Sequence, residues 1–296
     1  MQISRPSKSS MSSHVNVSNL PDPSIIARNL IYSDFRDLLH EEGSDIDDRV
    51  PSSYDFTTFN CSYWDSTTLA QHNSNNRTIF LLHFNIQCLP AKFDNLLTFL
   101  NLLSSNSYEN LPSILALSET WLDEFNEKAF PISGFHPLLS RSRKDNSSRG
   151  GVGLYIHDDI TFTPRPDLDI FIPFIFESTF VTLNDLNITI GVIYRSPAAN
   201  TAASLQACQQ HFYNLHQCKD KVFLLGDFNF DLLDYHSDTN VSEFVDLCFE
   251  FGFTPTITKP TRITSTCASC LDNIITNAPP NPLSSGDEAF SKSGGE

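Results

Sequence analysis

The chain has 296 residues, 40% of them hydrophobic and 24 of them Phe, which is enough for a sizeable core in one large domain or two small ones. Its 35 acidic and 19 basic residues give a formal net charge of −16, so DNA binding would require local basic loops or a metal ion rather than a globally basic surface. No apolar run reaches the ~20 residues of a membrane span and the amino terminus lacks the apolar core of a secretory signal, so we expect a soluble intracellular protein, nuclear or cytoplasmic, that is neither secreted nor bound to a membrane.

The first part of the chain, residues 1–77, is rich in Ser, Asn, Asp and Pro. We expect this extension to be largely disordered, with a short helix around Ile25–Leu39. Order is expected over residues 78–278. There the apolar run Thr78–Asn85 predicts a strand, and apolar residues at three- and four-residue spacing over Ala91–Leu103 predict a helix.

The rest of the ordered region mixes strands and helices. Strands are predicted at Ser113–Ser118, at Gly151–Ile156, twice within Ile175–Tyr194, at Val222–Leu225 and at Asn273–Thr276, and helices at Ala203–Leu215 and Val241–Phe249. Several hairpins among these elements favour an α/β sandwich of two sheets over a doubly wound sheet. Residues 279–296 form a polar tail that we expect to be disordered.

The stretch Val222–Phe230, with the sequence VFLLGDFNF, is the most informative part of the chain. It predicts a buried strand that ends at a glycine and is followed by Asp227 and Asn229. Because strand residues two apart point the same way, the carboxylate and the amide are expected to project together. Asp can orient or deprotonate a water, and Asn can bond a phosphate and its attacking water. A tight turn is the alternative, since Gly-Asp-x-Asn is also turn chemistry.

Polar residues stand at the ends of other predicted strands as well. They are Asn85, Glu119, Tyr194 and Asp272. Each also has a simpler explanation. Asn85 could be a turn residue, Glu119 a carboxylate at the start of a helix, Tyr194 a core aromatic residue and Asp272 a helix cap. Together they predict a hydrolytic site in which Glu119, helped by Asn85, binds Mg²⁺ or Mn²⁺, and Asp227 aligns the attacking water.

Seven cysteines are scattered along the sequence, an odd number that does not indicate a disulfide framework. Cys267 and Cys270 form a Cys-x-x-Cys pair. A zinc site would need a second pair of ligands nearby, and none follows. The pair therefore does not by itself indicate a metal or redox site.

These segments resemble the endonuclease/exonuclease/phosphatase superfamily, and specifically the apurinic-like endonuclease domain of non-LTR (LINE-type) retrotransposons. The matching pieces occur in family order over about residues 78–277: LLHFNIQCL, LALSETWLDE, SRSRKDNSSRGGVGLYI, FESTFVTL, IGVIYRSP, VFLLGDFNFDLL, TKPTRITST and SCLDNIITN. The resemblance implies an α+β fold, a four-layer α/β sandwich, and Mg²⁺-dependent nicking of DNA as the substrate. No stable protein partner can be inferred from the sequence, and no membrane partner is expected.

The resemblance also assigns roles to single residues. Asn85, Glu119, Tyr194, Asp227 and Asn229 match catalytic or metal-binding positions, and Asp272 matches the carboxylate that orients a catalytic histidine. Glu177 is expected to support the site, and Gln87 stands where some members carry an acidic metal ligand. Arg141, Arg143, Lys144 and Arg149 form a locally basic loop that would contact DNA phosphates or is simply a solvated loop.

Family members continue to a Ser-Asp-His segment whose histidine contacts the scissile phosphate, but this sequence has no histidine after His236. We therefore expect the C-terminal strand to be missing and the chemistry to be impaired. Three functions stay open. The first is an endonuclease derived from a non-LTR retrotransposon, the second a lipid or inositol phosphatase of the same superfamily, and the third a non-catalytic retroelement remnant that binds metal or nucleic acid.

Overall fold

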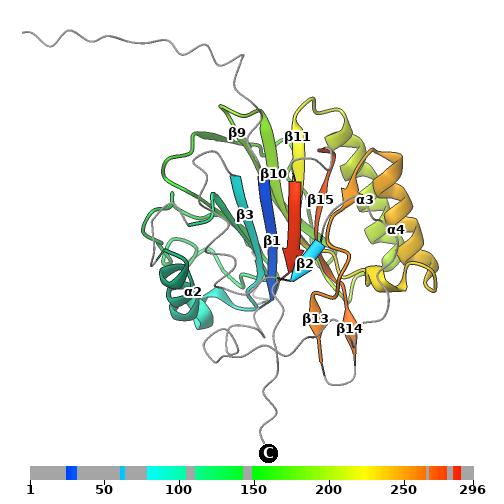
Figure 1. Cartoon of the computed structure of the whole chain (residues 1–296), viewed down its shortest axis with the longest axis horizontal. Helices are drawn as coiled ribbons and strands as arrows, with labels where there is room; N and C mark the ends of the chain where they lie inside the picture. Colours follow the sequence, from blue (N-terminus) through cyan, green and yellow to red (C-terminus); the bar gives the residue numbers. More distant parts are fainter. Residues whose placement is uncertain are drawn as a thin grey trace, which may run out of the picture.

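The computed structural model describes residues 25–31, 61–63, 79–104, 111–142, 149–264, 267–278 and 283–287. Two β-sheets pack face to face in it, and helices cover the outer face of each sheet (Figure 1). The order of the layers is therefore helix, sheet, sheet, helix. The α+β fold and the four-layer sandwich predicted from the sequence are thus confirmed.

The first sheet has the strand order β2-β16-β1-β3-β4-β6-β5. Its strands are β1 (Ile25–Ile31), β2 (Cys61–Tyr63), β3 (Ile79–Asn85), β4 (Ile114–Ser118), β5 (Leu139–Arg141), β6 (Val152–Ile156) and β16 (Leu283–Asp287). β3 lies between β1 and β4 and is parallel to both. The helix α2 (Leu89–Ser104) covers the outer face, where its buried Phe99 packs edge-on against Phe84 of β3.

The second sheet has the strand order β12-β15-β11-β10-β9-β7, and β8 also pairs with β9. Its strands are β7 (Phe162–Pro164), β8 (Phe171–Ile172), β9 (Phe176–Leu183), β10 (Ile188–Arg195), β11 (Lys221–Asp227), β12 (Thr254–Pro255) and β15 (Asp272–Thr276). The helices α3 (Thr201–His216) and α4 (Thr239–Glu250) cover its outer face (Figure 1). A 3₁₀ turn (Leu232–Asp234) precedes α4, and β13 (Arg262–Ile263) and β14 (Ala268–Ser269) form a separate hairpin.

The strand β3 shows how side-chain alternation builds both the core and the site. Phe80 and Phe84 point outward into the apolar cluster beneath α2, whereas Leu81 belongs to the core between the two sheets. Because successive strand side chains alternate between faces, His83 and Asn85 follow Leu81 on the inner face. One strand therefore anchors itself with apolar side chains and presents polar ones between the sheets.

Every strand and helix predicted between residues 78 and 277 is present, with shifts of at most a few residues. The helix expected around Ile25–Leu39 is wrong for its described part, because Ile25–Ile31 form β1, paired with β3 from Ile79 to Asn85. The seven-residue stretch IIARNLI is too short for its apolar spacing to distinguish a helix from a strand. The edge of β3 offers hydrogen-bond partners to a strand there.

Two more strands lie where disorder was expected. They are β2 in the N-terminal extension and β16 in the C-terminal tail. The expectation that the C-terminal strand is missing is therefore wrong, because β16 pairs with β1 and β2 in the first sheet. The other residues of 1–77 and 279–296 lie outside the described residues. The domain boundaries at residues 78 and 278 therefore stay a prediction.

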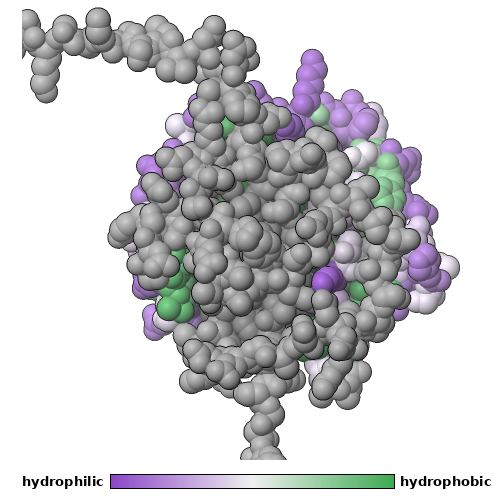
Figure 2. All heavy atoms as spheres, viewed as in Figure 1, coloured by the Kyte–Doolittle hydropathy of each residue, from purple (hydrophilic) through white to green (hydrophobic). Residues whose placement is uncertain are grey.

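The helices present mostly hydrophilic surfaces. Figure 2 shows hydrophilic residues along most of the described rim of one face, with small hydrophobic areas where α2 and α4 lie. Among the exposed large apolar side chains are Leu102 on α2 and Phe249 on α4. Within the described ranges, no helix combines the length and the hydropathy that crossing a membrane requires.

Candidate active site

The register of the second sheet aligns four of the residues singled out from the sequence. Glu177 of β9 pairs with Tyr194 of β10, Tyr194 pairs with Asp227 of β11, and Asp227 pairs with Asp272 of β15. Directly paired residues of neighbouring strands project from the same face of a sheet. These four side chains therefore form one row across the sheet, and all four residues are buried.

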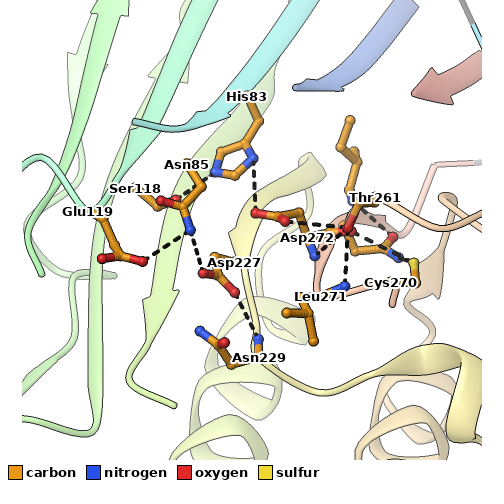
Figure 3. Close-up of polar contacts among 12 residues, drawn as sticks. His83, Asn85, Ser118, Glu119, Asp227, Asn229, Thr261, Cys270, Leu271 and Asp272 are labelled. Carbon is orange, nitrogen blue, oxygen red and sulfur yellow. Dashed lines mark hydrogen bonds and ion pairs between the residues drawn. The ribbon is translucent and has the colours of Figure 1, made fainter. Parts of the chain in front are cut away.

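The first sheet contributes Asn85 and Glu119 to the same place. The side-chain amide of Asn85 donates to Asp227, with 2.7 Å between Nδ2 and Oδ2, and to Glu119, with 3.1 Å between Nδ2 and Oε1 (Figure 3). Asn85 ends β3 and Glu119 directly follows β4, which is parallel to β3, so the two residues emerge at the same edge. The sandwich thus brings together three residues that the sequence placed on separate strand ends.

The loop after β4 holds Glu119 in an unusual backbone conformation. Glu119 and Trp121 both have a φ of +53°, in the left-handed region that non-glycine residues rarely adopt. The indole of Trp121 donates to Glu119, with 3.2 Å between Nε1 and Oε2, and its backbone N–H donates to the carbonyl of Gly150. Such conformations persist where the surroundings enforce them and are frequent at functional sites. Glu119 is half-buried, so its carboxylate remains accessible.

The turn after β11 differs from the sequence expectation. Asn229 was expected to project beside Asp227, but β11 ends at Asp227 and Asn229 has a φ of +50°. Its backbone N–H donates to Asp227 Oδ1 at 3.1 Å, and its side-chain amide donates to the carbonyl of Arg195 at 2.7 Å. The strand alternation therefore stops before Asn229, and the tight turn is the conformation found. Gly226 fits here because a Cβ would lie 2.0 Å from the carbonyl oxygen of Ile193.

The electrostatics of the site are dominated by carboxylates. Burial raises the pKa of Asp227 well above its usual value, and the charges of Asp272 and Glu119 raise it further. Burial also lowers the pKa of Lys92 to about 8, although the charges of Cys88 and Glu119 oppose that shift. The site therefore carries an excess of negative charge in a poorly solvated region, which a cation would relieve.

His83 is a site residue that sequence reasoning missed. It is fully buried, its Nε2 lies 3.1 Å from Ser118 Oγ, and its Nδ1 lies 4.0 Å from Asp272 Oδ1 (Figure 3). Burial lowers its pKa to about 3, so the ring is neutral near pH 7. The available signal was its position two residues before Asn85, on the same strand face.

The other residues that the sequence singled out are Glu177, the basic loop and Gln87, and the structure describes them to different extents. Glu177 accepts a hydrogen bond from the backbone N–H of Gly151 and so ties the second sheet to the first. Arg141 forms an ion pair with Asp169, with 2.6 Å between Nη2 and Oδ2, and Arg149 is exposed. Arg143 and Lys144 lie outside the described residues, so the basic loop expected from the sequence is only partly described. Gln87 has a φ of +44° just after β3.

The residues at the edge of the first sheet fit a magnesium ion. Asn85 Oδ1 is buried without a hydrogen-bond partner among the described residues, and the carboxylate of Glu119 accepts from the same amide group. Mg²⁺ prefers oxygen ligands and is commonly held by one or two protein groups together with water and phosphate oxygens. Over the described ranges, no three His, Cys, Asp or Glu residues are grouped to hold a metal, so a larger protein cage is not formed there.

Comparison with known proteins gives a match to one family model. The model of the endonuclease/exonuclease/phosphatase family matches residues 82–291. No curated protein matches the chain.

Three solved structures to which the chain is similar carry different descriptions. The 3′ phosphatase NExo from Neisseria bound to a product DNA hairpin has 17% sequence identity, with 66% of this chain and 84% of that chain covered and a TM-score of 0.44. The endonuclease domain of TRAS1, a telomere-specific non-LTR retrotransposon, has 11% identity, with 55% and 72% covered and a TM-score of 0.40. The catalytic domain of human Nocturnin with bound sulfate has 14% identity, with 65% and 79% covered and a TM-score of 0.43.

Proposed function

The chain belongs to the endonuclease/exonuclease/phosphatase family, and from this premise we propose that it is a Mg²⁺-dependent endonuclease that hydrolyses phosphodiester bonds in DNA. One observation carries the proposal. The amide of Asn85 donates to both Asp227 and Glu119, at 2.7 and 3.1 Å, and so places a water-orienting carboxylate beside a metal-binding one.

In the proposed site, Glu119 and Asn85 Oδ1 hold the metal ion. When bound there, Mg²⁺ supplies positive charge that neutralises the phosphodiester and the leaving oxygen. Trp121 keeps the carboxylate of Glu119 turned toward the site through its 3.2 Å hydrogen bond. Because Asn85 donates to Glu119 through Nδ2, its Oδ1 remains available as a metal ligand.

Asp227 aligns the attacking water in this proposal. The backbone N–H of Asn229 binds its Oδ1 and Asn85 binds its Oδ2, so the carboxylate is fixed in orientation. A fixed carboxylate can accept a proton from water at the start of attack. Tyr194 lies beside Asp227 in the same row and is proposed to steady the phosphate.

The choice of DNA and of the retrotransposon branch rests on sequence motifs. SETWL after β4, IYRSP at the end of β10 and GDFN at the end of β11 occur in the order of that branch. With a net charge of −16, the chain gains no affinity for DNA from its overall charge. The proposal therefore assigns binding to local groups such as the metal site and the exposed Arg149.

The test is a nicking assay of the full chain on supercoiled plasmid. We expect relaxed circles to form with Mg²⁺ or Mn²⁺ and not with EDTA, and Asp227→Asn to slow the reaction by ~10²- to 10⁴-fold. Phosphate release from phosphoinositides is measured beside the nicking assay. Phosphate release from them without plasmid nicking would support the phosphatase alternative and contradict the proposal, and absence of both activities would support the non-catalytic alternative.

A further inference from the structure

Two side chains of β3 face two carboxylates of the second sheet. Asn85 meets Asp227 at 2.7 Å, and His83, two residues earlier, lies 4.0 Å from Asp272 (Figure 3). Asp227 and Asp272 are themselves paired in register on β11 and β15. The four residues therefore form two neighbouring polar contacts that cross the space between the sheets.

The surroundings of His83 define which ring nitrogen carries the proton. Because an ionised carboxylate only accepts hydrogen bonds, we expect the proton on Nδ1, the nitrogen that faces Asp272 Oδ1 at 4.0 Å. Nε2 is then the acceptor for the hydroxyl of Ser118, at 3.1 Å. A neutral imidazole has one nitrogen with a proton and one without, and in this arrangement Nδ1 carries the proton and Nε2 accepts.

Asp272 is held on its other side by Thr261. The distance between Thr261 Oγ1 and Asp272 Oδ2 is 3.4 Å, and the same hydroxyl oxygen accepts from the backbone N–H of Asp272 at 3.3 Å. The carboxylate of Asp272 thus lies between a hydroxyl from the loop before β13 and an imidazole from the first sheet. Its orientation depends on both neighbours.

We propose that His83 is a positioning residue of the active site, whose Nδ1–H faces Asp272 Oδ1 at 4.0 Å and stabilises the orientation of that carboxylate electrostatically, and thereby influences the electrostatic field around Asp227. This inference rests on the proposed phosphodiesterase function. His83 is fully buried and does not touch the substrate. Its effect reaches the reaction through Asp272, which lies beside the water-orienting carboxylate. Loss of His83 therefore reduces kcat and leaves KM nearly unchanged.

Three substitutions separate positioning from packing. His83→Asn retains an amide N–H close to the Nδ1 position, His83→Gln carries its amide near the Nε2 position, and His83→Phe retains a ring without either nitrogen. Replacing a residue that orients another residue of the active site typically lowers activity by ~10- to 100-fold. We expect a loss of kcat of this size for Phe and Gln, and a markedly smaller loss for Asn.

The control is His211→Phe. His211 is also a fully buried histidine, but it lies on α3, packs against Phe176 and Phe180, and has no hydrogen-bond partner for either ring nitrogen among the described residues. Its replacement should leave kcat unchanged. If all three His83 variants retained the parent kcat, or all three lost it equally, the positioning role would be overturned.

A second measurement is independent of activity. In the full chain labelled with ¹⁵N-histidine, NMR should show the Nδ1–H tautomer for His83 at neutral pH. An Nε2–H tautomer would overturn the inference whatever the activity, because Nδ1 would then present a lone pair and not an N–H to Asp272. An inactive parent chain with the Nδ1–H tautomer would instead contradict only the proposed function.

Discussion

Asn85 and Asp227 lie 142 positions apart in the sequence and on different sheets, and their side chains meet with 2.7 Å between Nδ2 and Oδ2. The contact joins the two sheets at the edge where β3, β10 and β11 end. Because Asn85 also binds Glu119, the distance between the two carboxylates is set by a single amide group. Activity and local stability at this edge are therefore linked.

Asp227→Asn should separate activity from stability. We expect nicking to fall by ~10²- to 10⁴-fold, the typical contribution of a positioned acid–base group. Thermal stability at neutral pH should change much less than activity, because Asn removes the repulsion by Asp272 and Glu119 but presents its NH₂ group to one of the two N–H donors that bind Asp227. Differential scanning calorimetry beside the nicking assay measures both, with the exposed Asp246→Asn on α4 as the control. A less stable and fully active variant would contradict the assignment.

Metal binding should be visible through Trp121. Its indole donates to Glu119 Oε2 at 3.2 Å, so a cation bound by Glu119 changes the environment of the indole. The chain has two tryptophans, so Trp64→Phe leaves Trp121 as the fluorescent one. Titrating Mg²⁺ into this variant should change its tryptophan fluorescence, and EDTA should reverse the change.

Glu119→Gln should weaken the apparent Mg²⁺ affinity by ~10-fold or more, since a carboxylate–cation contact contributes several kcal/mol at the effective dielectric of a protein surface. Glu124→Gln, at an exposed position in the same loop, is the matched control. Equal Mg²⁺ affinity for the two variants would exclude Glu119 as a ligand.

Stability should decrease as the pH is lowered from about 6.5, because two histidines are buried in the neutral form. Burial lowers the pKa of His211 from its usual value of 6.5 to about 3, and burial lowers the pKa of His83 to about 3 as well. Below pH 6.5 the unfolded chain binds these protons and the folded chain does not. The stabilising contribution is therefore fully present above pH 6.5 and is lost as the pH falls toward 3.

The measurement is the free energy of unfolding in urea between pH 7 and pH 5. Each histidine adds a slope that grows as the pH falls through 6.5 and approaches ~1.4 kcal/mol per pH unit near pH 5. His211→Phe should remove its share of the slope and raise stability, since both nitrogens of His211 are buried without a partner among the described residues. An unchanged slope in this variant would show that His211 titrates normally in the folded state.

The strand β1 should be required for the stability of the first sheet. It pairs with β3 on one side and β16 on the other, so its removal leaves a parallel strand edge unpaired. A chain that starts at Thr78 should unfold at a lower temperature and aggregate more readily than one that starts at Leu20. A loss of ~2 kcal/mol corresponds to ~4–8 °C in a domain of this size. Equal unfolding temperatures would show that residues 78–278 form a domain without β1.

The sequence by itself determined the elements and several site residues. Continuous apolar runs such as Val222–Leu225 predict buried strands, and three- and four-residue spacing predicts helices such as α2. Asn85, Glu119 and Asp227 were identified because each follows such a strand, where polar side chains are otherwise unexpected. These signals are local, since each depends on residues a few positions apart.

Only the tertiary structure decided which residues meet. The register of β11 with β15 places Asp272 beside Asp227, and the packing of the two sheets brings His83 to within 4.0 Å of Asp272. A single histidine in an apolar strand carries no signal of its partner on a strand about 190 residues away. Likewise, β1 is a strand because β3 offers an unpaired edge, which a short apolar run does not reveal. Strand register and sheet packing depend on contacts between distant residues, and local spacing in the sequence does not encode them.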